Sequence, residues 1–175
     1  MSDYEAEVER HRERKDRYFA EDPSSPIPAD ERGGFEGLDY FPVEEAYRVV
    51  ATLREPDEKS TITVETTTDA EREYLVYGRL SLTIEGDEVT LNAYQPVDGP
   101  EYLWVPFRDA TSGEETYGAG RYLELDFEED RTDEGWLLDF NLAYSPFCAY
   151  NDAYECPLVP MANWLERPIR AGEKY

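Results

Sequence analysis

The stretch EYLVYGRLSLTIEGDEVTLNAYQ, residues 73–95, decides the fold class of this chain. Apolar and polar side chains alternate along both of its halves, which is the period of a β-strand with one buried face. The residues EGDE, 85–88, lie between the halves and carry the glycine typical of a tight hairpin turn. The stretch therefore predicts an antiparallel hairpin in the middle of the chain.

Five further segments share the strand pattern, and no helical pattern separates them. They are YRVVATL (47–53), TITVETT (61–67), YLWVPF (102–107), GRYLELDF (120–127) and GWLLDFN (135–141). With the central hairpin they make about seven strands joined mostly by short turns. The sequence therefore predicts a mainly β protein whose antiparallel sheet closes as a barrel or folds over as a sandwich.

The two ends of the chain depart from the strand pattern, although a length of 175 residues suits one domain, 1–175. Residues 1–21 predict an N-terminal helix, whose stripe at spacings of four and three holds Tyr4, Val8, His11, Lys15 and Tyr18. Residues 22–46, rich in proline and glycine, predict a connector to the sheet at 47–141. Residues 142–175 predict an ordered, irregular tail on the sheet, with one helical turn around Ala162–Leu165.

The chain is strongly acidic, with 41 Asp and Glu against 17 Lys and Arg and a formal charge of −24. Self-repulsion at this density destabilises a compact state in dilute buffer, whereas molar salt shortens the Debye length to about 3 Å. The composition therefore predicts a salt-adapted protein. It also argues against nucleic acid as a partner, because the basic cluster at residues 10–17 is interleaved with acids.

No segment approaches the eighteen consecutive apolar residues of a membrane-spanning helix, and the N-terminus lacks the apolar stretch of a signal peptide. We therefore expect a soluble, cytoplasmic protein without a membrane partner. In that compartment Cys148 and Cys156 are expected to be reduced.

The segment LLDFNLAY, 137–144, contains the most informative polar residues. Asp139 and Asn141 interrupt an apolar run, and a buried carboxylate needs an ionic or hydrogen-bonding partner. Arg121 is the predicted partner, since its strand precedes the Asp139 strand across one turn. The pair either fixes the sheet register or forms the floor of a pocket, with Asp139 as candidate base and Arg121 as candidate anion clamp.

The cysteines and the single histidine limit the other chemistries. A zinc site with four cysteines or two cysteines and two histidines is excluded, although a mixed site using Cys148, Cys156 and Asp152 or Asp139 stays open. Nucleophilic catalysis by cysteine or serine would depend on His11 as its base. Small buried apolar side chains are the preferred interpretation of both cysteines. No nucleotide-binding glycine motif is present, so the sequence assigns no cofactor.

Several long motifs, in order, resemble one family. They are FEGLDYFPVEEAYRVVATL (35–53), FRDATSGEETYGAGRYL (107–123), LDFNLAYSPFCAY (138–150), the spaced CPL, P, N and L of 156–165, and IRAGEKY (169–175). Together with the RxxKD pattern at 12–16 they resemble domain of unknown function family 1684, of which this chain looks like a salt-adapted, haloarchaeal-type member. Ser145-Pro146 and Val159 depart from its usual asparagine-proline and CPLPP patterns.

The resemblance implies a shared fold but no activity. Its matching positions are Arg108, Asp109, Thr111, Gly113, Thr116, Tyr117, Gly120, Arg121, Asp139, Asn141, Tyr144, Cys148, Cys156, Asn163, Gly172 and Glu173. These overlap the residues singled out by strand alternation.

Three functions remain open from the sequence. The leading one is a small-molecule pocket at one end of the barrel or sandwich, lined by Arg121, Asp139 and Asn141 and surrounded by Tyr144, Tyr117 and Asn163; whether it is an active site stays open. The second is a structural or protein-interaction module with an exposed aromatic patch at Tyr40–Phe41 or Tyr102–Trp104. The third is a metal site through Cys148 and Cys156.

Overall fold

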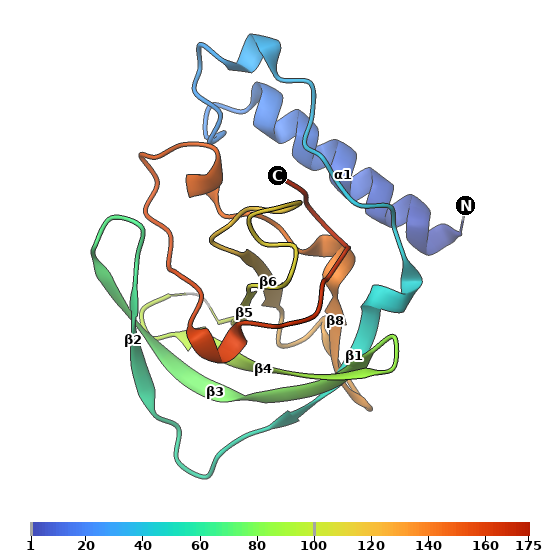
Figure 1. Ribbon diagram of the computed structural model, residues 1–175, viewed down its shortest axis with the longest axis vertical. Coiled ribbons are helices and arrows are strands. Elements are labelled where there is room, and N and C mark those ends of the chain that lie inside the picture. The colour runs from blue at the N-terminus through green and yellow to red at the C-terminus, as the bar shows by residue number, and fades with distance from the viewer. Residues whose placement is uncertain (1, 100) are drawn as a thin grey trace.

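The protein is built on one antiparallel sheet that curls into a half-barrel (Figure 1). The computed structural model describes residues 2–99 and 101–175. The strands follow the order β6-β5-β4-β3-β1-β8-β7, and β2 pairs with β3 off this path. Their bounds are β1 Arg48–Arg54, β2 Thr61–Glu65, β3 Glu71–Ile84, β4 Asp87–Pro96, β5 Leu103–Phe107, β6 Arg121–Leu125, β7 Arg131–Thr132 and β8 Gly135–Asp139.

The predicted strands are all present, so the mainly β, antiparallel fold class is confirmed. The central hairpin becomes β3 and β4, with Ser81 opposite Thr90. Its turn has positive φ at Glu85 (49°) and Gly86 (87°), as a two-residue turn that matches the twist of the strands requires. The two-residue strand β7, which the sequence did not predict, forms a hairpin with β8.

The two faces of the sheet carry different side chains. The main core on one face is mostly aliphatic and includes Leu80, Leu91, Val105 and Leu138. A second cluster on the opposite face is mostly aromatic. Neighbouring residues of one strand point to opposite faces, so Val105 enters the main core while Trp104 enters the aromatic cluster.

An irregularity in β3 brings one more tyrosine into the aromatic cluster. The register between β3 and β4 shifts between Val76 and Gly78. Gly78 suits this point, because a Cβ there would lie 2.8 Å from the backbone oxygen of Arg54. The extra residue reverses the alternation, so Tyr74 lies on the aromatic face although Leu80, also an even-numbered residue, lies in the main core.

The helix α1 (Asp3–Glu21) packs along one side of the half-barrel (Figure 1). Ser2 and Glu5 form a capping box at its start. Its buried residues are Val8, Arg12 and Phe19, so the predicted stripe was wrong at His11 and Tyr18, which are exposed. The helical period was right, but the buried face is displaced because Phe19 packs against Phe35, Phe147 and Tyr150.

The tail is ordered and largely irregular, as expected. Short 3-10 helices lie after β8 at Phe140–Leu142, Phe147–Ala149 and Met161–Asn163, the last close to the predicted turn. Two more lie in the connector before β1, at Arg32–Gly34 and Glu45–Tyr47. Residues 163–167 run beside 108–110 through backbone hydrogen bonds such as Leu165 N to Arg108 O at 2.7 Å. Ile169 and Ala171 then enter the main core. In the part of the chain described, no helix is long and apolar enough to cross a membrane.

Candidate functional site

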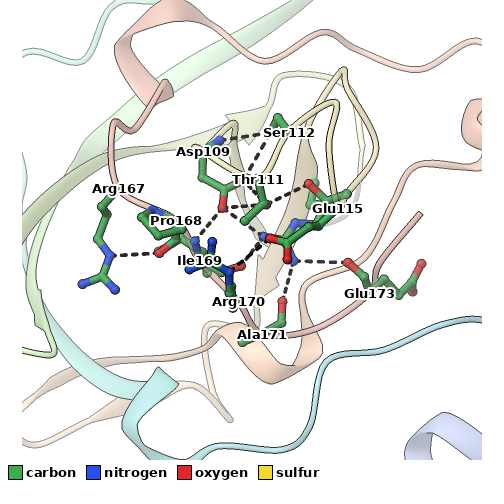
Figure 2. Close-up of polar contacts among 12 residues, drawn as sticks. Asp109, Thr111, Ser112, Glu115, Arg167, Pro168, Ile169, Arg170, Ala171 and Glu173 are labelled. Atoms are coloured by element: carbon green, nitrogen blue, oxygen red, sulfur yellow. Dashed lines mark hydrogen bonds and ion pairs between the residues drawn. The ribbon is translucent and has the colours of Figure 1, made fainter.

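Arg121 holds residues 168–173, called here the C-terminal segment, against the sheet. Its side chain is fully buried, and Nη2 donates to Ile169 O at 2.7 Å while Nη1 donates to the carbonyls of Ala171 and Glu173. Asp109 Oδ2 lies 3.5 Å from Nη2 and accepts from Ile169 N at 2.6 Å. Burial lowers the pKa of Arg121, and the nearby Asp109 opposes this shift. Figure 2 shows Asp109 beside the segment Pro168–Ala171.

The predicted pairing of Arg121 with Asp139 was wrong. Strand β6, which carries Arg121, pairs with β5, whereas β8, which carries Asp139, pairs with β1 and β7. Arg121 shares its face with Leu123 of the main core, while Asp139 follows Leu138 and points to the other side of its strand. A single pocket floored by both residues is therefore not formed. The Arg121 guanidinium is enclosed by the C-terminal segment, Asp109 and Phe107, so it is closed to a ligand in this structure.

Asp139 instead belongs to a polar cluster that ties α1 to the sheet. It accepts hydrogen bonds from Tyr4 Oη at 2.5 Å and from the backbone N and Nδ2 of Asn141 at 3.0 Å each. Asn141 is buried and also bonds the backbone of Glu44, with Nδ2 donating to its carbonyl and Oδ1 accepting from its amide. Burial, followed by the Asp139 contact, raises the pKa of Tyr4, so its hydroxyl stays protonated as the donor.

Two hollows share part of their lining, and one of them borders this cluster. One, of about 460 Å³, lies against α1 and is lined by residues that include His11, Lys15, Asp139 and Tyr144. The other, of about 270 Å³, lies over the aromatic cluster and is called here the aromatic hollow. Tyr144 lines both, and its hydroxyl donates to Glu124, which also lines both. The Tyr144–Glu124 pair is thus common to the two spaces.

The aromatic hollow is lined mainly by rings. Its lining consists of Arg72, Tyr74, Tyr102, Trp104, Tyr122, Glu124, Tyr144, Pro146, Phe147, Tyr154, Glu155, Cys156 and Pro157. Tyr74 stacks on Trp104 with centroids 4.6 Å apart, and Tyr122 meets Trp104 edge to face at 5.3 Å. Within the described chain the buried Nε1 of Trp104 has no hydrogen-bond partner. Burial, then the charge of Glu124, raises the pKa of Tyr102 to about 12.

The remaining predicted ligand residues have internal partners. Asn163 is fully buried, and its amide bonds the backbone of Asn92 and Pro106 at 2.7–3.0 Å, which joins the tail to β4 and β5. The hydroxyl of Tyr117 lies 3.6 Å from Cys148 Sγ. Neither residue lines the aromatic hollow, although Cys156 does.

Cys148 and Cys156 are free, buried thiols. Hydrogen bonds from Cys156 and then Tyr117 lower the pKa of Cys148 to about 6, against the effect of burial, while the pKa of Cys156 is raised by the same thiol pair. Across residues 2–99 and 101–175, no three His, Cys, Asp or Glu side chains are grouped to hold a metal ion.

The aromatic patches predicted for an interaction module are not exposed. Phe41 is 6% and Trp104 only 2% accessible, so both belong to packed clusters and this prediction was wrong. Large exposed apolar side chains occur instead at Met161 and Trp164, beside a further hollow. The aromatic hollow itself was not predicted, although alternation along YLWVPF and GRYLELDF places Trp104 and Tyr122 opposite the aliphatic face.

The fold and the hollow define a curled antiparallel half-barrel that carries an aromatic concavity on the face opposite its main core. The chain belongs to the family described as protein of unknown function (DUF1684), whose model matches residues 33–174. It is similar to an uncharacterised protein of Haloarcula marismortui solved by NMR in solution, with 43% identity, 99% of this chain and 95% of that chain covered, and a TM-score of 0.74. No curated protein matches the chain.

Proposed function

We propose that this protein binds a small organic molecule in the aromatic hollow. The observation that carries the proposal is the concave lining of rings over Trp104, on a face of the sheet that the main core does not use. Ligand sites are typically concave and apolar, with a few polar groups that orient the ligand. Arg72, Glu124 and Glu155 are such groups here.

The volume and the polar groups of the hollow limit the range of ligands that fit it. About 270 Å³ is just below the roughly 300–1,000 Å³ typical of ligand pockets, which favours a molecule of few heavy atoms. The polar groups of its lining, Arg72, Glu124 and Glu155, favour a ligand that has a polar or charged part besides its apolar surface.

Catalysis is a separate proposal, and Asp139, the candidate base predicted from the sequence, remains its candidate residue. Asp139 lines the neighbouring hollow and stays the candidate proton acceptor, but its partners are Tyr4 and Asn141 rather than Arg121. Arg121 is not retained as an anion clamp, because its three charged hydrogen bonds go to the C-terminal backbone. The alternative is a structural or interaction module in which the hollow stays empty.

The test is a fragment screen by NMR in molar potassium chloride, followed at the indole N–H signals. Binding in the hollow should shift the Trp104 signal saturably and leave those of Trp136 and Trp164, which lie outside its lining, unchanged. Tyr102→Leu should weaken binding, whereas Tyr77→Leu, a half-buried tyrosine on the main-core side, should not. A screen in which no fragment moves the Trp104 signal would leave the interaction module as the better account.

A further inference from the structure

We infer that the aromatic hollow recognises a small organic cation of the quaternary-ammonium class. This inference rests on the proposed function and names the chemistry of its ligand. It is carried by the aromatic lining, by the balance of charge around it and by its small size.

Hydrogen bonds hold two of the lining rings, Tyr122 and Tyr144, in position. Tyr122 Oη donates to Pro157 O and Tyr144 Oη donates to Glu124, so neither ring is free to turn away. Seven of the thirteen lining residues are aromatic, and the face of an aromatic ring carries negative partial charge. A cation placed over several such faces is attracted by each of them, and the attraction is stronger where water is excluded.

The charges around the hollow also favour a cation. Its lining includes two carboxylates, Glu124 and Glu155, against one guanidinium, Arg72. That guanidinium is already engaged, since its Nη2 donates to Glu155 O at 3.1 Å and lies 3.7 Å from Glu155 Oε2. An anionic ligand would therefore meet a net negative lining whose one cation is paired. Burial, and after it the charge of Glu124, raises the pKa of Tyr102 and Tyr144.

A lining made mostly of rings favours a fully substituted ammonium over one that carries N–H groups, although Glu124 Oε2 has no partner among the described residues. Glu124 accepts from Tyr144, and Glu155 accepts from Thr66 Oγ1 at 3.1 Å in addition to its contacts with Arg72. A primary ammonium has three donors to satisfy, and each one buried without a partner is costly. A quaternary ammonium has none, and its methyl groups pack on rings.

The experiment uses three probes that share a compact methylated centre and differ in charge: tetramethylammonium, tert-butanol and pivalate. Each is titrated in molar potassium chloride while the Trp104 indole signal is recorded, with Trp136 and Trp164 as internal references. Tetramethylammonium should bind at least about threefold more tightly than either other probe, because one cation–ring contact corresponds to roughly a 2- to 30-fold change in Kd. Tyr102→Leu should weaken tetramethylammonium by a factor in this range.

A second variant separates ring attraction from charge. Glu124→Gln keeps an acceptor for Tyr144 Oη and removes one negative charge. Because Glu124 is exposed, its effect on tetramethylammonium should be small in molar salt and should grow as salt is lowered, while its effect on uncharged tert-butanol should not depend on salt.

The outcomes distinguish this inference from the proposed function. Equal or tighter binding of tert-butanol or pivalate would overturn the cation inference and leave the hollow a binding site. Failure of all three probes, with fragments from the screen still moving the Trp104 signal, would do the same. Failure of the probes and of every fragment would remove the proposed function as well.

Discussion

Replacement of Arg121 by methionine should be among the most damaging single changes in this protein. The side chain is fully enclosed and donates to three carbonyls of the C-terminal segment, at Ile169, Ala171 and Glu173. Methionine fills much of the same volume but supplies no donor. The change therefore removes three charge-assisted hydrogen bonds and leaves Asp109 without its cation.

The magnitude follows from the loss of one partner of a buried pair. Breaking such a pair typically costs about 3–5 kcal/mol, because the other charge stays buried and uncompensated. Asp109 keeps hydrogen bonds from Thr111 Oγ1 and Ile169 N, which places the expected loss toward the lower end of that range. For a protein of this size, about 3 kcal/mol corresponds to a melting temperature lower by roughly 6–12 °C.

The assay is thermal and urea unfolding in molar potassium chloride, followed by tryptophan fluorescence. Arg121→Lys should fall between the wild type and Arg121→Met, because lysine keeps the charge but not the forked geometry. Arg79→Met is the matched control: Arg79 is exposed on β3 and bonds Thr90, so its replacement should change stability by less than about 0.5 kcal/mol.

A loss below about 1 kcal/mol for Arg121→Met would refute the reasoning. It would mean that the apolar contacts and remaining hydrogen bonds of the C-terminal segment hold it in place without the guanidinium. Hydrogen exchange adds an independent readout, since the Ile169 amide donates to Asp109 and should exchange faster in the variant.

Four further outcomes are expected. Gly172→Ala should destabilise by about 1–3 kcal/mol in unfolding experiments, because φ is +79° and the new Cβ would lie 2.6 Å from Ala143 O; Gly33→Ala, in open space, is its control. Tyr4→Phe should lower stability by about 1 kcal/mol, since Asp139 and Asn141 lose their shared hydroxyl, and an unchanged melting curve would contradict the cluster's role. Alkylation of Cys148 should lose half its rate near pH 6 as acid protonates the thiolate, and Cys156→Ala should move that midpoint upward, toward about 8.5; equal midpoints would argue against the thiol contact. Lowering salt from about 1 M to about 0.1 M should lower the melting temperature, because the charge of −24 is then less screened, and a flat salt dependence would count against salt adaptation.

The fold could be predicted because its signals are local. Alternation along residues 73–95 depends on which face of the sheet is buried, and the turn depends on two residues with positive φ. The helix was also predicted, but its buried face was not, since that depends on rings contributed by the connector and the tail. Local periodicity thus identifies an element more securely than it identifies the surface against which the element packs.

The site was harder to predict because it depends on which strands become neighbours. Arg121 and Asp139 lie on strands that are close in sequence. However, β8 pairs with β1, the first strand along the chain, whereas β6 pairs with β5. The aromatic hollow gathers rings from β3, β5, β6 and the tail, and the shift at Val76 and Gly78 reverses the alternation that would have placed Tyr74. Alternation alone does indicate Trp104 and Tyr122 as a shared aromatic face.

The most direct test of the central claim is the position of a bound ligand. Intermolecular nuclear Overhauser effects should be recorded between the methyl protons of tetramethylammonium and the ring protons of the protein in molar potassium chloride. We expect contacts to Tyr74, Tyr102, Trp104 and Tyr122, four of the rings that line the hollow. Contacts confined to other surfaces, such as Met161 and Trp164, would contradict the assignment of the aromatic hollow as the binding site.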